Sequence, residues 1–266
     1  MPFVEIRTTR NSILSYAEHF HSGISLGLIT GGKTCLNIDG ERYIVEKGDL
    51  VLIAPGQVHS CNPVNGRPRD YHMLIIDDRW CVEHFGRYFK TEKTLRVPRP
   101  VVRDVEIYAE AIRLVKALLC GSMTQRMQKN FEAFISKLLR TYAVSEYSNH
   151  KNDDKYLSLL NIAHGPEQGY AMGNDLSVST LARSAGVRRE SFSRYIRRLT
   201  GLSPQLYLHC LRLEKGRRFL REGKTIAEAA FASGYADQSH FHRMFLRFYS
   251  VTPGCYRKNR SHLFKK

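Results

Sequence analysis

The stretch TIAEAAFASGYADQSHFHRMFLRFYSVTPGCYR, residues 225–257, decides the fold of the C-terminal part of the chain. Thr225 and, three residues later, Glu228 form a capping box, which predicts the start of a helix. Gly234 predicts its end, because glycine takes the left-handed conformation there without strain. Asp237 is a good N-cap for the next helix. Two helices joined by a tight glycine turn form a helix-turn-helix, whose second helix enters the major groove of DNA.

That second helix has a predicted inner face and is followed by another helix start. Apolar side chains at helical spacing give the inner face: Phe241, Met244, Phe245 and Phe248. Thr252 is a suitable N-cap and Pro253 a suitable first helical residue. The unit is therefore expected to end in a third helix.

A second copy of the pattern occurs 48 residues earlier, in LSVSTLARSAGVRRESFSRYIRRLTGLSPQLYLHC, residues 176–210. Its alanine-lined helix contains Leu181 and Ala182, and Gly186 corresponds to Gly234. The predicted inner face of its second helix comprises Phe192, Ile196 and Leu199. Ser203 and Pro204 repeat the cap and proline that start the third helix of the other copy. The repeat predicts two helix-turn-helix units.

The outward faces of the two second helices carry polar and cationic side chains. Those predicted to read base edges are Glu190, Ser193, Arg194, Arg197, Gln238, Ser239, His242 and Arg243. Those predicted to contact phosphates are Arg189, Arg198, Arg247, Arg257 and Lys258. For any one arginine the alternative is a solvated helix face. Two copies with the same division of faces argue against that alternative for the whole set, so double-stranded DNA is the predicted partner.

The distribution of charge supports this partner. The chain has a net charge of +16. Residues 1–149 hold 20 Lys and Arg against 16 Asp and Glu, whereas residues 150–266 hold 21 against 9. An excess of +12 on the shorter part indicates an anionic partner there. Between the two copies, LRLEKGRRFLREG predicts a basic helix that spaces the two reading heads.

The N-terminal part has a different pattern. From Ile24 to about Ile76, short runs rich in β-branched residues alternate with glycine, Asp-Gly and Pro-Gly breaks: GISLGLIT, KTCLNIDG, ERYIVEKG and DLVLIAPG. This predicts a small antiparallel barrel or jelly roll. The fold class is therefore α+β, with a sensory domain at residues 1–149 and an all-α DNA-binding domain at residues 150–266.

Two helices are predicted after these strands. The first apolar stripe consists of Val101, Val105, Tyr108, Ile112, Val115 and Leu119. Its spacing is close to a heptad repeat, so residues 101–119 are predicted to form a homodimer seam, with packing on the barrel as the alternative. The second stripe consists of Phe131, Ile135, Leu138 and Tyr142. For this stripe, packing on the barrel and packing on another subunit remain equally open.

The remaining features concern linkers and compartment. SEYSNHKNDD, residues 145–154, reads as a linker, and HGPEQGYAMGND, residues 164–175, reads as a loop. No apolar run is long enough to span a membrane, and the start lacks the apolar stretch of a secretory signal. Six cysteines without CxxC spacing fit a reducing cytoplasm.

The C-terminal copy resembles the signature of the AraC/XylS family of transcription regulators. The matching positions are Ile226, Ala229, Ala230, Gly234, Tyr235, Asp237, Ser239, Phe241, Arg243, Phe245, Thr252, Pro253, Tyr256 and Arg257. The resemblance covers roughly residues 176–260 and implies recruitment of RNA polymerase, with activation more common than repression. Two departures leave the base preference of the first head open. Arg188 stands where the family often has a small capping residue, and Glu190 places a carboxylate on the DNA-facing side.

The N-terminal part is similar to the cupin barrel that usually accompanies this module. His19 and His21 precede the strands, and GDLVLIAPGQVH, residues 48–59, resembles the second cupin motif. The resemblance implies a small-molecule effector whose binding changes how the DNA-binding heads are held. The candidate effector contacts are His19, His21, Arg42, His59 and Trp80.

Cupins also include metal enzymes, which gives a rival interpretation. His19, His21 and His59 offer three imidazoles to a first-row metal. Metal-binding cupins place a glutamate shortly after the second of these histidines, where this chain has Ile24 and Ser25. No nucleophile and base stand together elsewhere. The prediction is therefore a chain that is not an enzyme, with no catalytic residue, no cofactor and no metal.

A second rival is redox or metal sensing by cysteine. Cys35, Cys61 and Cys81 lie in the predicted sensory domain. Scattered thiols in a cytosolic barrel are more often small core hydrophobes, and that interpretation is preferred.

Overall fold

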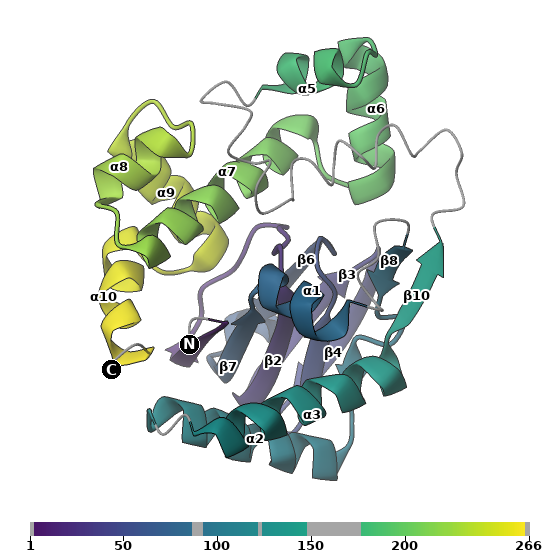
Figure 1. Cartoon of the computed structure of the whole chain (residues 1–266), viewed down its shortest axis with the longest axis vertical. Coiled ribbons are helices and arrows are strands. Elements are labelled where there is room, and N and C mark those ends of the chain that lie inside the picture. Colours follow the sequence, from purple (N-terminus) through teal and green to yellow (C-terminus); the bar gives the residue numbers. More distant parts are fainter. Residues whose placement is uncertain (1–2, 87–92, 122–123, 148–176, 264–266) are drawn as a thin grey trace. The chain divides into compact units, whose positions relative to one another are not determined.

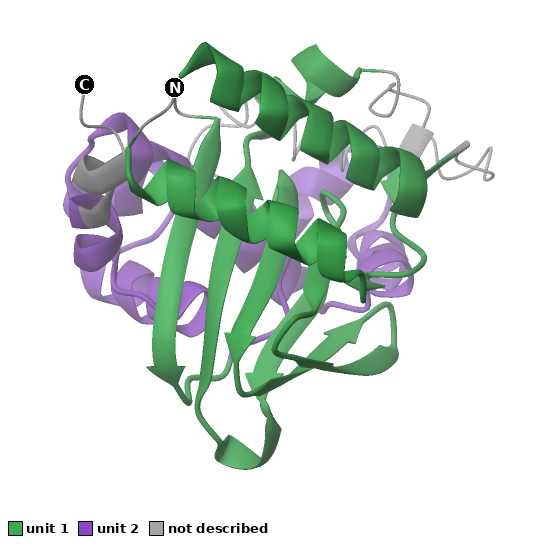
Figure 2. Cartoon of the chain, turned by 90° about the horizontal axis from the view of Figure 1, so that it is seen from below, with its two compact units in different colours: residues 1–15, 21–147, 260–266 green, residues 16–20, 148–259 purple. Residues whose placement is uncertain are grey.

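A computed structural model defines residues 3–86, 93–121, 124–147 and 177–263. Residue contacts divide the chain into two compact units (Figure 2). The first comprises residues 1–15, 21–147 and 260–266, and the second comprises residues 16–20 and 148–259. Among the described residues, the first unit contains the strands and three α-helices, and the second is helical (Figure 1).

The first unit is built on a five-stranded antiparallel sheet with the order β1-β7-β2-β5-β9. In that order the strands are Val4–Ser12, Arg69–Ile76, Ile24–Gly31, Leu50–Ile53 and Val101–Val102. The central strand β2 is apolar and buried on both faces. One face, with Ile24, Leu26 and Leu28, belongs to a core shared with helices. The opposite face, which begins with Ser25, points towards a second sheet.

This second sheet has three antiparallel strands in the order β4-β3-β6. Their bounds are Glu41–Glu46, Lys33–Ile38 and His59–Pro63. The hairpin between β3 and β4 turns through Asp39 and Gly40, both with positive φ, as the Asp-Gly break predicted. A one-turn 3-10 helix, Val64–Gly66, precedes β7. A separate pair joins β8 (Lys93–Arg96) to β10 (Val144–Tyr147).

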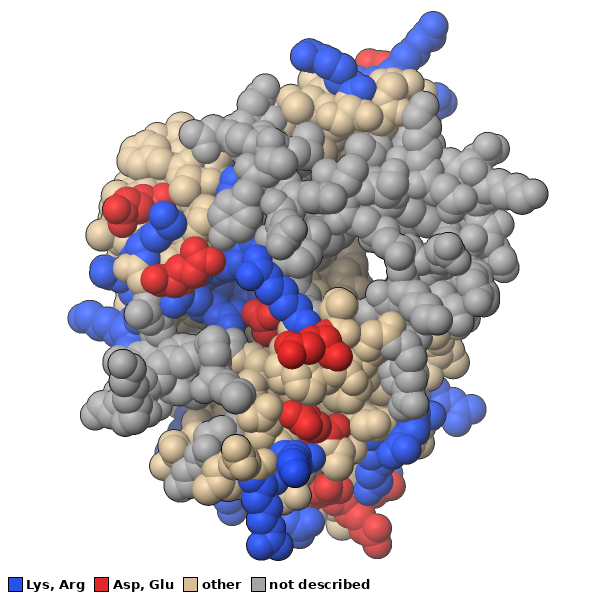
Figure 3. All heavy atoms as spheres, in the orientation of Figure 1, with Lys and Arg blue, Asp and Glu red and all other residues tan. Residues whose placement is uncertain are grey.

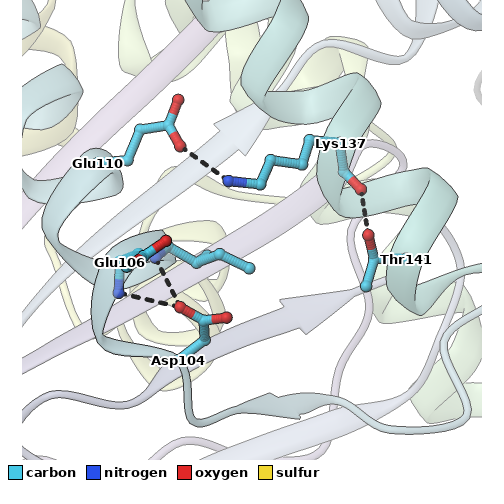
Figure 4. A network of polar contacts seen from close by, with 6 residues as sticks. Asp104, Glu106, Glu110, Lys137 and Thr141 are labelled. Carbon is cyan, nitrogen blue, oxygen red and sulfur yellow. Dashed lines mark hydrogen bonds and ion pairs between the residues drawn. The ribbon is translucent and has the colours of Figure 1, made fainter.

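Three helices complete the first unit: α1 (Asp78–Phe85), α2 (Val105–Leu119) and α3 (Gln125–Tyr142). They pack on the outer face of the five-stranded sheet and share one apolar core with it (Figure 2). Asp104 caps α2 through the amides of Glu106 and Ile107 (Figure 4). An ion pair of 3.4 Å joins Lys137 of α3 to Glu110 of α2 (Figure 4). The cap fixes where α2 begins. The shared apolar core holds α2 and α3 together, and the partly exposed ion pair adds little to it.

The stripe predicted as a dimer seam is divided by this packing. Val101 lies in β9 rather than in the helix, and Val115 is 1% exposed inside the unit's own core. Val105 is 84% and Leu119 is 45% exposed. The buried face of α2 follows Ile107, Ala111 and Val115, because a straight helix repeats every 3.6 residues and drifts away from a heptad line. In the second stripe, Phe131, Ile135 and Leu138 are buried in the same core, so that stripe packs within its own unit.

The second unit contains six described helices. They are α5 (Val178–Ser184), α6 (Arg189–Thr200), α7 (Pro204–Glu222), α8 (Ile226–Ala232), α9 (Gln238–Tyr249) and α10 (Pro253–Leu263). Ser203 caps α7 through the amide of Leu206, and Thr252 caps α10 through the amide of Cys255. Both caps and the prolines that follow them agree with the predictions from sequence.

The linker prediction was partly wrong. Residues 145–147 belong to β10, because their pairing with β8 satisfies backbone groups that a linker would leave to water. The rest of that segment, the predicted loop at residues 164–175 and the predicted boundary at residues 149–150 lie outside the described residues. Within the described ranges, no helix has the length and apolar character needed to cross a membrane.

Candidate nucleic-acid interface and effector site

Helices α5 and α6 form the first helix-turn-helix. Ser177 caps α5 through the amide of Thr180, and Gly186 follows the helix with a φ of +60°. Leu181 and Ala182 of α5 are buried, as are Phe192 and Ile196 of α6. These contacts fix the angle between the two helices by apolar packing, as the sequence predicted.

The inner face of α6 differs from the prediction at one residue. Leu199 is 39% exposed, whereas Tyr195 is buried. Tyr195 lies one turn after Phe192 and one residue before Ile196, so it falls within the buried stripe. An aromatic side chain with a hydroxyl gives a weaker apolar signal than leucine, and this is why the sequence misassigned the two.

The outward face of α6 presents mostly cationic groups. Arg194 and Arg197 are exposed, together with Glu190 in the first turn, while Ser193 is half-buried. Of the predicted phosphate contacts, Arg189 and Arg198 are exposed. The guanidinium of Arg198 lies 5.5 Å from the centre of the Tyr195 ring. No side chain caps the start of α6 at Arg188.

Helices α8 and α9 form the second helix-turn-helix. The capping box predicted at Thr225 and Glu228 is present in both directions. Gly234 has a φ of +86° between the two helices. The side chain of Asp237 accepts a hydrogen bond of 2.7 Å from the amide of His240, which starts α9. The capping box, the turn glycine and the N-cap predicted for this unit are therefore all present in the structure.

The two faces of α9 are clearly separated. The buried residues are Phe241, Phe245, Phe248 and Tyr249, while Met244 is half-buried. Gln238, Ser239 and Arg243 are exposed on the outward side, and His242 is half-buried. The predicted phosphate contacts Arg247, Arg257 and Lys258 are all exposed.

Helix α7 connects the two helix-turn-helices and packs closely on the C-terminal one. A Cβ atom placed on Gly216 would lie 2.6 Å from Cε2 of Phe241, so only glycine allows this approach. The Tyr249 hydroxyl donates a hydrogen bond of 2.7 Å to Glu214, which is also 2.8 Å from Arg217. Burial raises the pKa of the Tyr249 hydroxyl, so it remains a donor. This buried network fixes α9 against α7.

Lys and Arg side chains gather over α7, α9 and α10 on the face seen in Figure 3, with a few acidic groups among them. Two side chains of α7 lie here that were not predicted to contact DNA, His209 and Arg212. The His209 ring lies 5.7 Å from the ring of His240 of α9, measured between centroids. The contact joins residues 31 positions apart, so no local pattern in the sequence could have indicated it.

The inward faces of the two sheets in the first unit form the candidate effector site. Ser25 of β2 is 1% exposed and Thr34 of β3 is 2% exposed. Their hydroxyl oxygens have no hydrogen-bond partner among the described residues. Buried polar atoms are normally paired, and a ligand is one reason for an exception. Neither residue was predicted, because one sequence does not show which alternate side chains of a strand point inwards.

Arg69 of β7 is the largest fully buried side chain of the described residues and was also missed. Its Nη2 donates hydrogen bonds to the carbonyls of Leu14 (3.0 Å) and Cys61 (2.8 Å). The guanidinium lies 5.4 Å from the centre of the Tyr71 ring. Every second residue of a strand lies on the same face. Arg69, Tyr71, Met73 and Ile75 of β7 therefore all point inwards, on the same face as Ser25.

The predicted effector residues have different surroundings. His21 and His59 are buried, with ring centroids 5.5 Å apart. Nδ1 of His59 donates to the carbonyl of Gln57 (2.9 Å), which leaves Nε2 as the acceptor of the neutral ring. His19 is also buried, but belongs to the second unit, where its ring edge meets Phe248.

A family model of the AraC-like ligand binding domain matches residues 4–142, and a model of a helix-turn-helix domain matches residues 181–259. The chain belongs to the AraC family. It is accordingly a DNA-binding transcription regulator with an N-terminal ligand-binding domain, as the resemblance implied. The α+β class and the helical second half are confirmed as well.

Similar AraC-family proteins extend over nearly the whole chain. The transcriptional activator RhaS of Enterobacter sp. (strain 638) is 33% identical and covers 87% of this chain and 78% of its own. RclR of Escherichia coli (strain K12), described as an RCS-specific transcriptional activator, is 28% identical over 82% of this chain and 78% of its own. The crystal structure of ToxT from Vibrio cholerae O395 has the same fold, with a TM-score of 0.63 and 14% identity over 100% of both chains.

Two other predicted effector contacts of this AraC-family chain point away from the inner faces. Trp80 of α1 is 7% exposed and stacks on Phe3 at 4.5 Å, within the core that faces the helices. Arg42 is exposed on the outer face of β4, where its Nε donates to Cys35 Sγ at 3.0 Å. Alternation along the strand places Arg42 opposite the inward side.

The three cysteines considered for sensing lie in the first unit. Cys35 and Cys81 are buried. Burial raises the pKa of Cys61 to about 12, so its thiol stays protonated and a poor nucleophile at neutral pH. All six cysteines are free thiols.

Proposed function

We propose that α6 and α9 enter two adjacent segments of the major groove and read their bases. The observation that carries the proposal is the shared construction of the two heads. Each recognition helix buries one aromatic-rich face and exposes polar and cationic groups on the other. Both heads are joined to one helix, α7, so a single DNA site is contacted by both.

Within this proposal the exposed residues have two roles. Arg194, Arg197, Gln238, Ser239 and Arg243 read base edges, with help from Glu190, Ser193 and His242. The residues proposed to hold phosphates are Arg189, Arg198, Arg247, Arg257 and Lys258. His242 and Ser193 are half-buried, so their contacts are more limited than those of the exposed arginines.

The proposed effector site lies between the two sheets of the first unit. The polar groups there are the hydroxyls of Ser25 and Thr34, the Nε2 of His59 and the guanidinium of Arg69. They suit a small polar molecule that accepts hydrogen bonds from the guanidinium and the hydroxyls and donates one to Nε2 of His59. ToxT, which shares the fold, has been crystallised with an unsaturated fatty acid. His21 remains part of the proposal, whereas Arg42 and Trp80 are better explained by their outer-face and core positions.

The regulation that we propose is allosteric activation. Effector binding shifts an equilibrium between arrangements of the DNA-binding heads, and DNA binding must then change effector affinity by the same factor. RhaS and RclR are named activators, which supports activation rather than repression of transcription. Recruitment of RNA polymerase, action in the cytoplasm and a homodimer through the exposed part of α2 belong to the same proposal. No catalytic step, cofactor or metal is needed for it.

The test is a pull-down of fragmented genomic DNA on the purified full chain, sequenced at two salt concentrations. We expect a few enriched sites, each with two short motifs about one helical turn apart. A matched control replaces both Arg194 and Arg243 by Ala. Enrichment that lacks paired motifs, or that the double variant retains unchanged, would contradict base reading by two heads.

A further inference from the structure

Four cationic or ionisable side chains meet where α7 passes beside α9. We call this group the α7–α9 rim, and it consists of His209, Arg212, His240 and Arg247. His209 Nδ1 lies 3.4 Å from the hydroxyl of Tyr235, whose ring also meets the ring of His240 edge-on at 5.2 Å. Tyr235 is 3% exposed, so the two histidines of the rim pack on a buried aromatic ring.

The rim is electrostatically costly in the free protein. Burial lowers the pKa of His209, and the nearby charges of Arg212, His240 and Arg247 lower it further. Arg212 comes from the same helix, while His240 and Arg247 come from α9. His209 is therefore predominantly neutral at pH 7. An anion placed at the rim would offset this repulsion and raise the pKa of His209.

The position of the rim indicates which anion it would meet. His240 and Arg247 are seven residues apart, which is about two turns, so they share one side of α9. Arg243 lies between them in the sequence and is exposed on the outward face. The rim consequently lies next to the face of α9 that is proposed to enter the groove. A helix in the major groove has a sugar-phosphate backbone on each side, so the rim would lie near one of them.

We propose that the α7–α9 rim binds a backbone phosphate of DNA and that His209 takes up a proton when it does so. The inference rests on the proposed entry of α9 into the major groove. It assigns a DNA contact to helix α7, which otherwise only connects the two heads. The phosphate carries no sequence information, so the rim contributes affinity and orientation rather than base preference.

The sign of the pH dependence follows from the two pKa values of His209. In the free protein the pKa is below the usual 6.5, and a phosphate bound at the rim would raise it. Protons are therefore taken up on binding at pH values between the two. Affinity for DNA rises as the pH falls through this window, by up to about tenfold for each unit between the two pKa values. It becomes constant below the lower pKa.

The experiment measures the affinity of the full chain for its cognate duplex, by fluorescence anisotropy, from about pH 5.5 to pH 8. The duplex is the site enriched in the genomic pull-down. We expect wild-type affinity to rise towards acidic pH and His209→Gln to remove most of that rise. The matched control is His72→Gln, because His72 also has a pKa lowered by burial but lies on β7 of the first unit.

A second variant tests the phosphate without titration. Arg212→Gln is expected to reduce the slope of log affinity against log salt by about one phosphate, roughly 0.9, while leaving the ranking of cognate and mutated sites unchanged. If His209→Gln keeps the wild-type pH profile, or Arg212→Gln keeps the wild-type salt slope, the rim does not bind phosphate. If the wild type binds no duplex at any pH, the proposed function fails first and the rim proposal with it.

Discussion

Helix α9 begins at Asp237, whose side chain accepts a hydrogen bond from a backbone amide, whereas α6 begins at Arg188, which makes no such bond. The second head also has a complete capping box, and helix α7 packs directly on its aromatic core. The first head has no capping box, and its outward face places arginines beside a carboxylate, Glu190, whereas that of the second head places arginines beside neutral polar groups. Local order and outward chemistry thus differ between two units of one architecture. We infer that the start of the second recognition helix is the better ordered of the two, and that each head contributes to both base reading and phosphate binding.

The largest effect is expected where the second head meets α7. Gly216→Val places side-chain atoms within 3 Å of the Phe241 ring, and overpacking of this kind costs roughly 2–3 kcal/mol of unfolding free energy. Urea denaturation followed by circular dichroism measures it. The control is Gly201→Ala at the end of α6, where a Cβ meets nothing within 4 Å and only the positive φ opposes it, at about 1–2 kcal/mol. A loss from Gly216→Val no larger than that from Gly201→Ala would mean that the Phe241 ring moves aside and that α7 is not tightly packed on the second head.

The next effect concerns base reading by α9. Arg243→Ala is expected to weaken binding to the cognate duplex by about 1–3 kcal/mol and to relax one base position. Competition binding against a library of single-base variants measures both quantities. Arg197→Ala in the first head is the matched variant, and it should relax a position in the other half of the site. Equal weakening on cognate and random DNA by Arg243→Ala would refute its base-reading role.

A smaller effect tests the difference in capping. Asp237→Ala is expected to cost about 1 kcal/mol, because the amide of His240 loses its acceptor. Arg188→Ser should have the opposite sign and stabilise the first head by about 0.5–1 kcal/mol. Thermal unfolding of both variants measures the pair. A neutral or destabilising Arg188→Ser would show that something other than a missing cap governs the start of α6.

The smallest effect is expected beyond the two heads, on α10. Arg257 is exposed near the start of that helix, and Arg257→Ala should weaken binding to every sequence while reducing the salt slope by about 0.9. Titrations at three salt concentrations on cognate and random duplexes measure this. Loss of sequence preference without a change of slope would contradict the phosphate assignment.

Much of the second unit could be predicted because its signals are local. Thr225, Glu228, Asp237 and the two turn glycines act through neighbours within a few residues, and the structure contains all of these features. On α6 the sequence predicted Leu199 as buried, whereas Tyr195 is the buried residue. Counting only apolar residues misses such a position, because a tyrosine can be buried while its hydroxyl faces outwards.

The features that escaped prediction depend on distant partners. The α7–α9 rim joins residues 31 positions apart, and β10 pairs with β8 about fifty residues earlier in the chain. Ser25 and Thr34 face inwards because of sheet register, which alternation alone leaves undecided between two faces. The stripe predicted on α2 included residues at both ends that are not part of its buried face. The reason is that a heptad repeat and a 3.6-residue period coincide over only a few turns.

Helix α7 has one more property, which comes from its length rather than from its side chains. It runs unbroken for 19 residues from the end of the first head to the start of the second, a span of about 28 Å. Its C-terminal half is locked to α9 by Gly216 and by the Glu214–Tyr249 hydrogen bond. Inserting one residue near its middle would turn the second head by about 100° around the helix axis while moving it only about 1.5 Å. The count of residues in α7 therefore sets the rotational phase between the heads, much as the pitch of DNA sets the phase between two half-sites.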